Sequence, residues 1–290
     1  MTIRRLLGIL FIRQGKTRRE SKMLRSLKRT VLSFAAFILI WQAAVAFGDF
    51  NPALFPKPQK VLETFQELIS TGLQGSSSGI SLFAHIQASL ARFFAGYVLA
   101  VVFGVVLGLL LGWFPRVFAY VNPVIQLLRP IAPVVWLPFI VLWIGIGDVP
   151  AVAIIFIAGF FPVLLSTAGA VSSVDPVFLK VAENFNLSQF RTVAGIVFPA
   201  AFPQIANSLH LALSTFWIFL VSGEMVGAQS GLGFLVMDAK NCIRADALLA
   251  AMITIGGLGV LLDFLIGRLE KWMSNTWGFG IVKYEKERGR

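Results

Sequence analysis

Three residue patterns in this chain could carry chemistry, and none of them is complete. Gly15-Lys16-Thr17 matches the end of a phosphate-binding loop, but that loop requires a glycine at position 10, where the chain has Leu10, and a preceding strand. The one cysteine, Cys242, excludes an intrachain disulfide, and the two histidines, His85 and His210, are too few and too scattered for a metal cluster. We therefore expect no catalytic residues, no metal and no cofactor in this chain.

The composition is that of a membrane protein. Of its 290 residues, 57% are hydrophobic and only 13% are charged, which is too little charge for the surface of a soluble domain. Several uncharged runs approach the length of helix that crosses about 30 Å of hydrocarbon. Because these runs are continuous and rich in Leu, Ala and Gly, they favour helices over a barrel. We predict an all-α polytopic membrane protein.

The apolar runs predict six transmembrane helices, the third of them broken by prolines. We place five of them at about Val31–Phe47, Phe93–Trp113, Val149–Val171, Gln204–Ser222 and Ala247–Gly267. The third lies in the hydrophobic region that follows Trp113, is broken by Pro123, Pro130, Pro133 and Pro138, and reaches Gly147. Between these spans we expect a short amphipathic helix at about Pro58–Leu68, one or two short helices within the polar stretch Ser172–Pro203, and an external loop at Gly227–Asp246.

Glycines recur at four-residue spacing in the second predicted span, at Gly104, Gly108 and Gly112. Glycines so spaced form a flat groove that another helix can approach closely. We expect that helix to belong to the same chain, and a seam between two copies of the chain is the alternative.

The net charge of +11 is concentrated next to the terminal spans. Ten of the 25 Lys and Arg residues fall within Met1–Thr30, and six lie between Arg268 and Arg290. Under the positive-inside rule this predicts that both termini are cytoplasmic, and the basic blocks are also suited to anionic lipid. No aromatic residue interleaves the cluster Lys16–Arg29, so the sequence does not favour a nucleic-acid partner.

The chain divides into four segments on these grounds. They are a basic cytoplasmic N-terminal segment (residues 1–30), a first transmembrane helix with its external connector (31–84), a core transmembrane domain (85–269) and a basic cytoplasmic tail (270–290).

The polar stretch after the fourth predicted span carries a family resemblance. The run Lys180-Val-Ala-Glu-Asn-Phe-Asn186, followed by Ile196 and Pro199, resembles the cytoplasmic EAA loop of binding-protein-dependent ABC importer permeases. Asn186 stands where that pattern has glycine, and asparagine is the residue that next best tolerates a left-handed turn. Lys180 stands where the pattern has glutamate, which reverses a charge but leaves the expected shape of the loop.

Two further stretches are similar to the nitrate, sulfonate, taurine and bicarbonate branch of these permeases. They are Leu128-Arg-Pro-Ile-Ala-Pro-Val-Val-Trp-Leu-Pro138 with Leu142-Trp-Ile-Gly-Ile-Gly147, and Gly223-Glu-Met-Val-Gly-Ala-Gln-Ser-Gly-Leu-Gly233. The resemblance covers about His85–Leu269.

The resemblance implies the permease subunit of an ATP-driven importer in a bacterial inner membrane. Its implied partners are two ATP-binding subunits, which would hold ATP and Mg²⁺, an external substrate-binding protein and a second permease subunit. A homodimer is expected and pairing with a paralogue is the alternative. The residues implied to couple to the ATPase are Val181, Ala182, Glu183, Asn186, Leu187, Ser188 and Arg191. The implied solute is a small anion such as nitrate, bicarbonate, a sulfonate or taurine, with a heterocyclic vitamin precursor as the alternative.

Five residues within or beside the spans are candidates to line a translocation pathway: Arg129, Trp136, Trp143, Trp217 and Glu224. A charge at membrane depth is a functional candidate by default, and Arg129 would suit an anion. Its alternative roles are to snorkel towards the membrane interface or to cap the carbonyls freed by Pro130 and Pro133. For Glu224 the alternative is pairing with loop residues or with Arg244, and for the tryptophans it is packing or interface anchoring.

Three other classes of membrane protein compete with the importer interpretation. An ion-coupled secondary transporter should carry coupling carboxylates within its spans and two similar halves, and neither pattern is present. A channel should have a filter-like motif, and a membrane-embedded enzyme should have a nucleophile or a metal set.

Overall fold

The computed structural model describes residues 28–48, 51, 53–76 and 79–276, with side chains as far as Arg268. In this part the chain forms helices joined by turns. They are an N-terminal helix Lys28–Phe47, α2 (Pro58–Ser70), α3 (Leu82–Trp113), α4 (Pro115–Leu128), the 3₁₀ helix η1 (Pro133–Trp136), α5 (Leu137–Ile144), α6 (Asp148–Ser172), α7 (Pro176–Asn184), α8 (Gln189–Thr192), the π-helical turn η2 (Val193–Val197), α9 (Phe198–Gly227), α10 (Leu232–Asn241) and α11 (Ala245–Thr276).

Five of the described stretches are long and apolar enough to cross a membrane. They are Lys28–Phe47, Leu82–Trp113, Asp148–Ser172, Gln189–Gly227 and Ala245–Arg268. A sixth candidate is the pair α4 and Pro133–Ile144, which is bent by 82°. The multi-span, all-α prediction is therefore confirmed for the described residues. The bend falls where prolines interrupt the apolar run, since proline cannot donate its backbone nitrogen to the turn before it.

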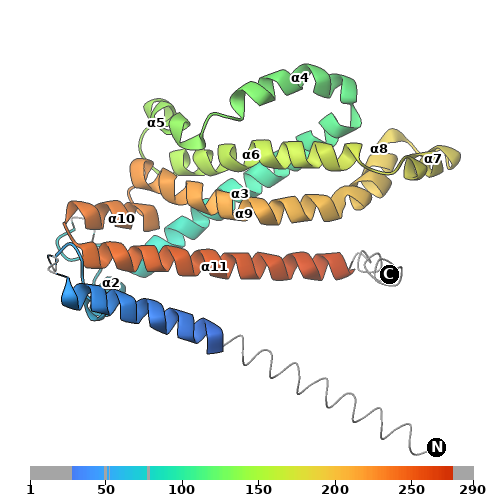
Figure 1. Ribbon diagram of the computed structural model, residues 1–290. Helices are drawn as coiled ribbons and strands as arrows, with labels where there is room; N and C mark the ends of the chain where they lie inside the picture. The colour runs from blue at the N-terminus through green and yellow to red at the C-terminus, as the bar shows by residue number, and fades with distance from the viewer. Residues whose placement is uncertain (1–27, 49–50, 52, 77–78, 277–290) are drawn as a thin grey trace, which may run out of the picture.

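Figure 1 shows α6, α9 and α11 running side by side, with α3 crossing behind them and α4 arching over α6. α7 and α8 lie at one end of this bundle, whereas α2 and α10 lie at the opposite end. The chain therefore has two distinct ends separated by the length of its spans.

Two spans begin earlier than the sequence predicted. The second begins at Leu82 rather than Phe93, because the polar side chains of its first turns are buried inside the protein instead of ending the helix. The fifth begins at Gln189 rather than Gln204, because α8, η2 and α9 are continuous. Pro199 has no N–H for the carbonyl of Gly195, and the chain widens there into a π-helical turn instead of breaking.

Two of the segments between the spans contain helices, and one of these helices was not predicted. The amphipathic helix expected at Pro58–Leu68 is present as α2, Pro58–Ser70. The external loop expected at Gly227–Asp246, however, contains the ten-residue helix α10. Gly231, the residue before α10, has φ 106°, a conformation that favours glycine. Because the Ser-Gly pattern there indicates a turn, the sequence analysis predicted a loop and not the helix that follows.

The glycine stripe of α3 packs against α6 of the same chain. A Cβ atom built on Gly104 would lie 2.8 Å from Val163 Cγ1, and one on Gly108 would lie 2.6 Å from Thr167 Cβ. Gly112 faces Val171 in the same way, at 2.7 Å. The groove is therefore filled within the chain, as expected, and these three glycines do not form a seam between copies.

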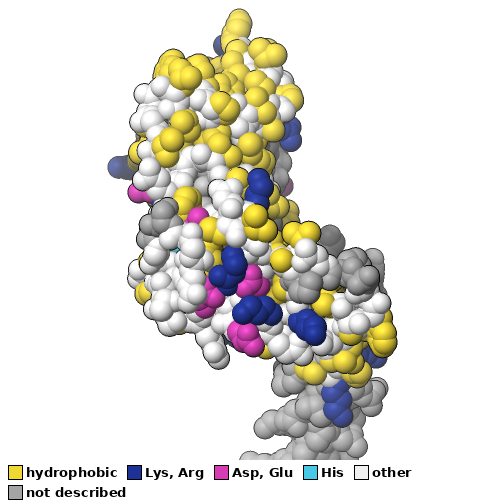
Figure 2. Space-filling model, turned by 90° about the vertical axis from the view of Figure 1, so that its left-hand side faces the viewer, with side chains coloured by type: hydrophobic (Ala, Val, Ile, Leu, Met, Phe, Trp, Pro, Cys, Tyr) yellow, Lys and Arg dark blue, Asp and Glu magenta, His cyan; other side chains and the backbone are white. Residues whose placement is uncertain are grey.

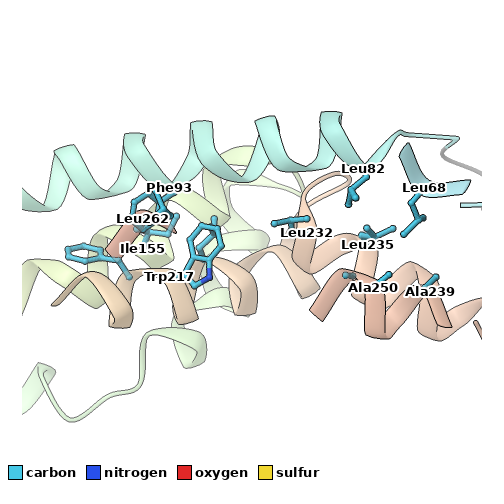
Figure 3. Packing of buried hydrophobic residues seen from close by; sticks show 14 of the residues in the cluster. Leu68, Leu82, Phe93, Ile155, Trp217, Leu232, Leu235, Ala239, Ala250 and Leu262 are labelled. Atoms are coloured by element: carbon cyan, nitrogen blue, oxygen red, sulfur yellow. The ribbon is translucent and has the colours of Figure 1, made fainter. Parts of the chain in front are cut away.

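The apolar core lies between α3, α6, α9 and α11. Phe93 contacts Trp217 edge-to-face at 5.6 Å between ring centroids, and the indole Nε1 of Trp217 donates to the carbonyl of Ile255 at 3.1 Å. Figure 3 shows the same core continuing through Leu232 to Leu68 of α2. Packing contacts and internal hydrogen bonds hold helices together in lipid, where the hydrophobic effect between helices is absent.

The close approach of α3 to α6 can be tested at Gly108. We expect Gly108→Ala to lower the stability of the purified protein in detergent by about 1–3 kcal/mol, because the added methyl overlaps Thr167. The matched control is Gly256→Ala in α11, where a Cβ would meet nothing within 4 Å. Thermal unfolding of both variants measures the difference, and equal effects at the two sites would contradict the packing argument.

Candidate functional site

At one end of the bundle α7 and α8 form a helix–turn–helix with a defined bend. The carboxylate of Asp175 caps α7 by accepting from the backbone N–H of Val177 at 2.8 Å. At the other end of α7 the N–H of Asn186 bonds to the carbonyl of Glu183 at 2.9 Å, and the N–H of Leu187 bonds to that of Ala182 at 3.1 Å. These two bonds make a Schellman turn, which requires a left-handed residue.

Asn186 supplies that left-handed residue, with φ 48°. The sequence prediction that asparagine preserves the bend in place of glycine is therefore confirmed. The turn sets the angle at which α8 leaves α7, and the two short helices together form a projection at this end of the bundle.

This projection exposes apolar side chains. Phe185 is 74% exposed and Phe190 is 82% exposed, and Val181 and Phe178 are also exposed. Of the seven residues predicted to couple to an ATPase, six are exposed and Ala182 is buried. The sequence prediction did not include Phe185 and Phe190, although both lie within the predicted segment.

The five candidate pathway residues do not come together in one place. Trp217 is 8% exposed and belongs to the core, and Glu224 is fully buried. Trp143 is exposed on α5, where its ring lies 4.7 Å from that of Phe139. Trp136 is half-buried in η1, and Arg129 is exposed beside a small cavity at the break after α4.

Glu224 belongs to a buried ion pair that the sequence prediction missed. Arg92 of α3 is 5% exposed and its Nη1 donates to Glu224 Oε1 at 2.7 Å. The hydroxyl of Ser89 lies 2.8 Å from Glu224 Oε2. Arg92 also pairs with Asp148 at the start of α6, but that carboxylate is 74% exposed and the contact is screened by solvent. Arg244, which the sequence analysis named together with loop residues as a possible partner of Glu224, lies in a separate cluster.

The same charges hold the turn Ser230–Gly233 against α3 and α9. Arg92 Nη1 donates to the carbonyl of Ser230 at 2.8 Å, and the N–H of Gly233 donates to Glu224 Oε2 at 3.0 Å. The N–H of Gly231 donates to His85 Nδ1 at 3.0 Å. A Cβ at Gly231 would lie 2.3 Å from Glu224 Oε1, so the turn needs glycine for its close approach as well as for its backbone conformation.

A signal for Arg92 was present in the sequence. Together with His85 and Ser89, it follows the three- and four-residue spacing of one helix face that continues into the glycines of α3. A prediction that began the span at Phe93 placed these side chains outside the membrane helix, and so left Glu224 without its partner.

A second polar cluster joins α2 to the start of α11. α10 ends in a turn with Ile243 at φ 55°, and this turn brings Arg244 between two carboxylates. Its Nη2 lies 2.8 Å from Glu67 Oε2 and 2.8 Å from Asp246 Oδ2. The hydroxyl of Thr64 donates to Asp246 Oδ2 at 2.7 Å. Figure 2 shows Lys and Arg side chains gathered with Asp and Glu side chains on this end of the molecule.

The electrostatics of this cluster favour the ionised carboxylate. The hydrogen bond from Arg244 lowers the pKa of Glu67, and partial burial opposes it with a smaller effect. Among the described residues no group of three or more His, Cys, Asp or Glu side chains could hold a metal ion.

The fold and these sites define a polytopic helical membrane protein with an exposed helical projection at one end and a hydrogen-bonded polar turn at the other. Residues 64–275, most of the chain, match the family described as binding-protein-dependent transport system inner membrane component. The chain belongs to this family. It is therefore an integral membrane permease component of a transport system, not a catalytic subunit, and the secondary-transporter alternative falls away.

The chain aligns with similar permease proteins over most of their length. The chain is 31% identical to the taurine transport system permease protein TauC of Escherichia coli (strain K12), covering 88% of this chain and 91% of that protein. It is 30% identical to the putative aliphatic sulfonates transport permease protein SsuC of Bacillus subtilis (strain 168), over 84% and 87% of the two chains. A structure of the MetNI methionine ABC transporter has a similar fold, with a TM-score of 0.59 at 20% identity, over 68% of this chain and 95% of that one.

The buried pair predicts an asymmetric mutational response. We expect Arg92→Met to destabilise the protein by about 3–5 kcal/mol, because it leaves Glu224 buried with much of its compensation removed. The double variant Arg92→Met with Glu224→Met should recover a large part of this loss. Unfolding in detergent measures the cycle, with Asp148→Asn as a control expected to cost at most about 1 kcal/mol. A double variant as unstable as the single one would contradict the account.

The Glu67–Arg244 pair predicts an acid-sensitive junction. Because the folded state lowers the pKa of Glu67, its contribution to stability is present above the usual pKa of a glutamate and is lost as pH falls through the lowered value. We expect Glu67→Gln to flatten the fall of the unfolding temperature on acidification. Glu63→Gln is the matched control, because Glu63 is exposed and pairs with the exposed Lys60. Identical pH profiles for wild type and Glu67→Gln would contradict this role.

Proposed function

We propose that two copies of this chain form the translocation pathway of an ATP-driven importer for a small organic or inorganic anion. Two ATP-binding subunits, which hold ATP and Mg²⁺, dock on the cytoplasmic side, and an external binding protein delivers the solute. The family supports the ATPase and the binding protein as partners. The homodimer is the simplest assembly that completes a pathway from a chain of this size.

The exposed projection α7–α8 is the observation that carries this proposal. An exposed group of Val181, Phe185 and Phe190 on a short polar helix pair is unfavourable in water and is suited to a protein groove. The left-handed turn at Asn186 makes the pair rigid enough to transmit a displacement. Closure of the ATPase dimer would then move the spans as rigid bodies, because α8 continues through η2 directly into α9.

We assign the projection to the cytoplasm on charge. α11 runs from the α10 end to the α7–α8 end, and the basic residues from Arg268 onward lie in its last turns and after it in the sequence. Positive residues accumulate on the cytoplasmic side of membrane proteins. The polar turn Ser230–Gly233 and α2 then lie on the external side of a bacterial inner membrane, where a binding protein arrives.

The solute class follows from the relatives and from one side chain. One relative is named for taurine and another for aliphatic sulfonates. In this chain Arg129 provides a positive charge at the break of the third span. We propose that a small anion is the solute, and that Arg129 and the tryptophans of η1 and α5 face its pathway, whereas Trp217 and Glu224 maintain the structure.

The docking role can be tested on the two exposed phenylalanines. We expect the double variant Phe185→Ala with Phe190→Ala to lose most of the ATPase that copurifies with the chain from its own membranes. Each removal of an exposed aromatic anchor should weaken association by at least about tenfold. Quantitative mass spectrometry of the purified complex, with its ATP hydrolysis, measures the loss.

The matched control is Tyr120→Ala, which removes an equally exposed aromatic side chain from α4. This variant should copurify the ATPase at the wild-type level. If the phenylalanine variant retained the ATPase in full while remaining folded, the projection would not be the docking surface.

A further inference from the structure

A residue with a strained backbone lies at the end of α10. Among the described residues two that are not glycine have a positive φ, Asn186 at 48° and Ile243 at 55°. Both end a short helix in the same kind of turn. The N–H of Ile243 bonds to the carbonyl of Lys240 at 3.1 Å, and the N–H of Arg244 bonds to that of Ala239 at 2.9 Å. This Schellman turn requires a left-handed residue directly after the helix.

The turn explains the conformation of Ile243 but not its residue type. Glycine and asparagine adopt the left-handed conformation most readily, whereas a side chain that branches at Cβ is among the least suited to it. A glycine would bring Arg244 between Glu67 and Asp246 equally well, because both bonds of the turn join backbone atoms. The isoleucine therefore weakens the fold without improving the turn.

The side chain of Ile243 also contributes little to packing within the chain. It is 70% exposed, and its neighbours Lys240 and Asn241 are exposed as well. The core side chains of α10, in contrast, are fully buried at Leu232 and Leu235. Strained residues cluster at places where a protein engages another molecule. An exposed isoleucine held in such a conformation is therefore suited to a contact outside this chain.

The position of Ile243 favours a soluble protein over lipid as its partner. The residue precedes the span Ala245–Arg268, so it lies beyond the end of that span and next to the cluster of Arg244 with its two carboxylates. Figure 2 shows charged side chains of both signs on this end of the molecule. An apolar side chain among such charges faces water and not hydrocarbon. This is the end that we assign to the external side.

We propose that Ile243 is an anchor for the external binding protein, which receives its side chain in an apolar pocket with carboxylates at the rim. Stable contacts between proteins combine a few buried apolar anchors with a polar rim. Lys240 provides the cation of that rim, and opposite charges across a rim speed association. This inference rests on the proposed function and names where the binding protein contacts this chain.

The test compares wild type with Ile243→Gly in the full-length chain, purified with its ATPase and reconstituted in liposomes. ATP hydrolysis is measured against the concentration of the substrate-binding protein of the same transport system. We expect the concentration for half-maximal stimulation to rise roughly tenfold, because an apolar anchor is lost, while the maximal rate is unchanged.

Stability should change in the opposite direction. The unfolding temperature of the Ile243→Gly chain in detergent should rise by about 2 °C, because glycine relieves the strain at this position. Weaker association in a more stable protein cannot result from misfolding. An unfolding temperature below that of wild type would contradict the argument from strain.

Two further variants separate the side chain from the backbone. Ile243→Asn should behave as Ile243→Gly does, whereas Ile243→Val should keep half-maximal stimulation near the wild-type concentration, because it retains a branched apolar side chain. The matched control is Ile69→Ala, which removes a 62% exposed isoleucine from the helical backbone of α2. It should change neither the half-maximal concentration nor the unfolding temperature by a comparable amount.

The outcomes distinguish this inference from the function on which it rests. Equal half-maximal concentrations for wild type and Ile243→Gly would overturn the anchor alone. A shift present in liposomes but absent in detergent would assign Ile243 to a lipid contact and would also overturn the anchor. A wild-type complex whose ATP hydrolysis did not respond to the binding protein would overturn the proposed function, and the anchor with it.

Discussion

The close approach of α3 to α6 is the constraint on which the other features of this molecule depend. Gly104, Gly108 and Gly112 leave room for the side chains of α6, so the two helices touch along their length. The same face of α3 continues toward its N-terminus through Ala100 and Gly96 to Arg92, Ser89 and His85. The seam that lets the helices pack therefore also aims a guanidinium into the protein, where a longer interhelical distance would leave it in lipid or solvent.

Once Arg92 is inside, electrostatics determines the architecture of the α10 end. A buried guanidinium requires a buried carboxylate, and Glu224 of α9 meets it at 2.7 Å. The turn Ser230–Gly233 accepts from Arg92 and donates to Glu224, beside Ser89 and Asp148, which is why that turn packs tightly and needs its glycines. The opposite end differs, because α7 and α8 leave large apolar side chains exposed. The α10 end pairs its buried charges within the chain, whereas the α7–α8 end exposes apolar surface.

Periodicity and composition were sufficient to predict the class of fold, because a run of apolar residues at membrane depth has only one common solution, a helix. The left-handed turn at Asn186 was also predictable, since few residues adopt that conformation without strain. The helix α10 was not predicted, because its formation depends on contacts with α3, α9 and α11 more than on its own ten residues. Segment boundaries at 1–30, 31–84, 85–269 and 270–290 remain predictions.

The two arginines of the spans show why a functional site is harder to predict from sequence than a fold. Arg92 and Arg129 both interrupt apolar sequence. Their roles differ because of partners far along the chain: Glu224 is 132 residues from Arg92, whereas no described carboxylate pairs with Arg129. A buried, paired charge stabilises one conformation and is unavailable to a solute. Arg129, which pairs with no described carboxylate, keeps its hydrogen-bond donors available, and this difference is the basis on which we propose Arg129 and not Arg92 for the pathway.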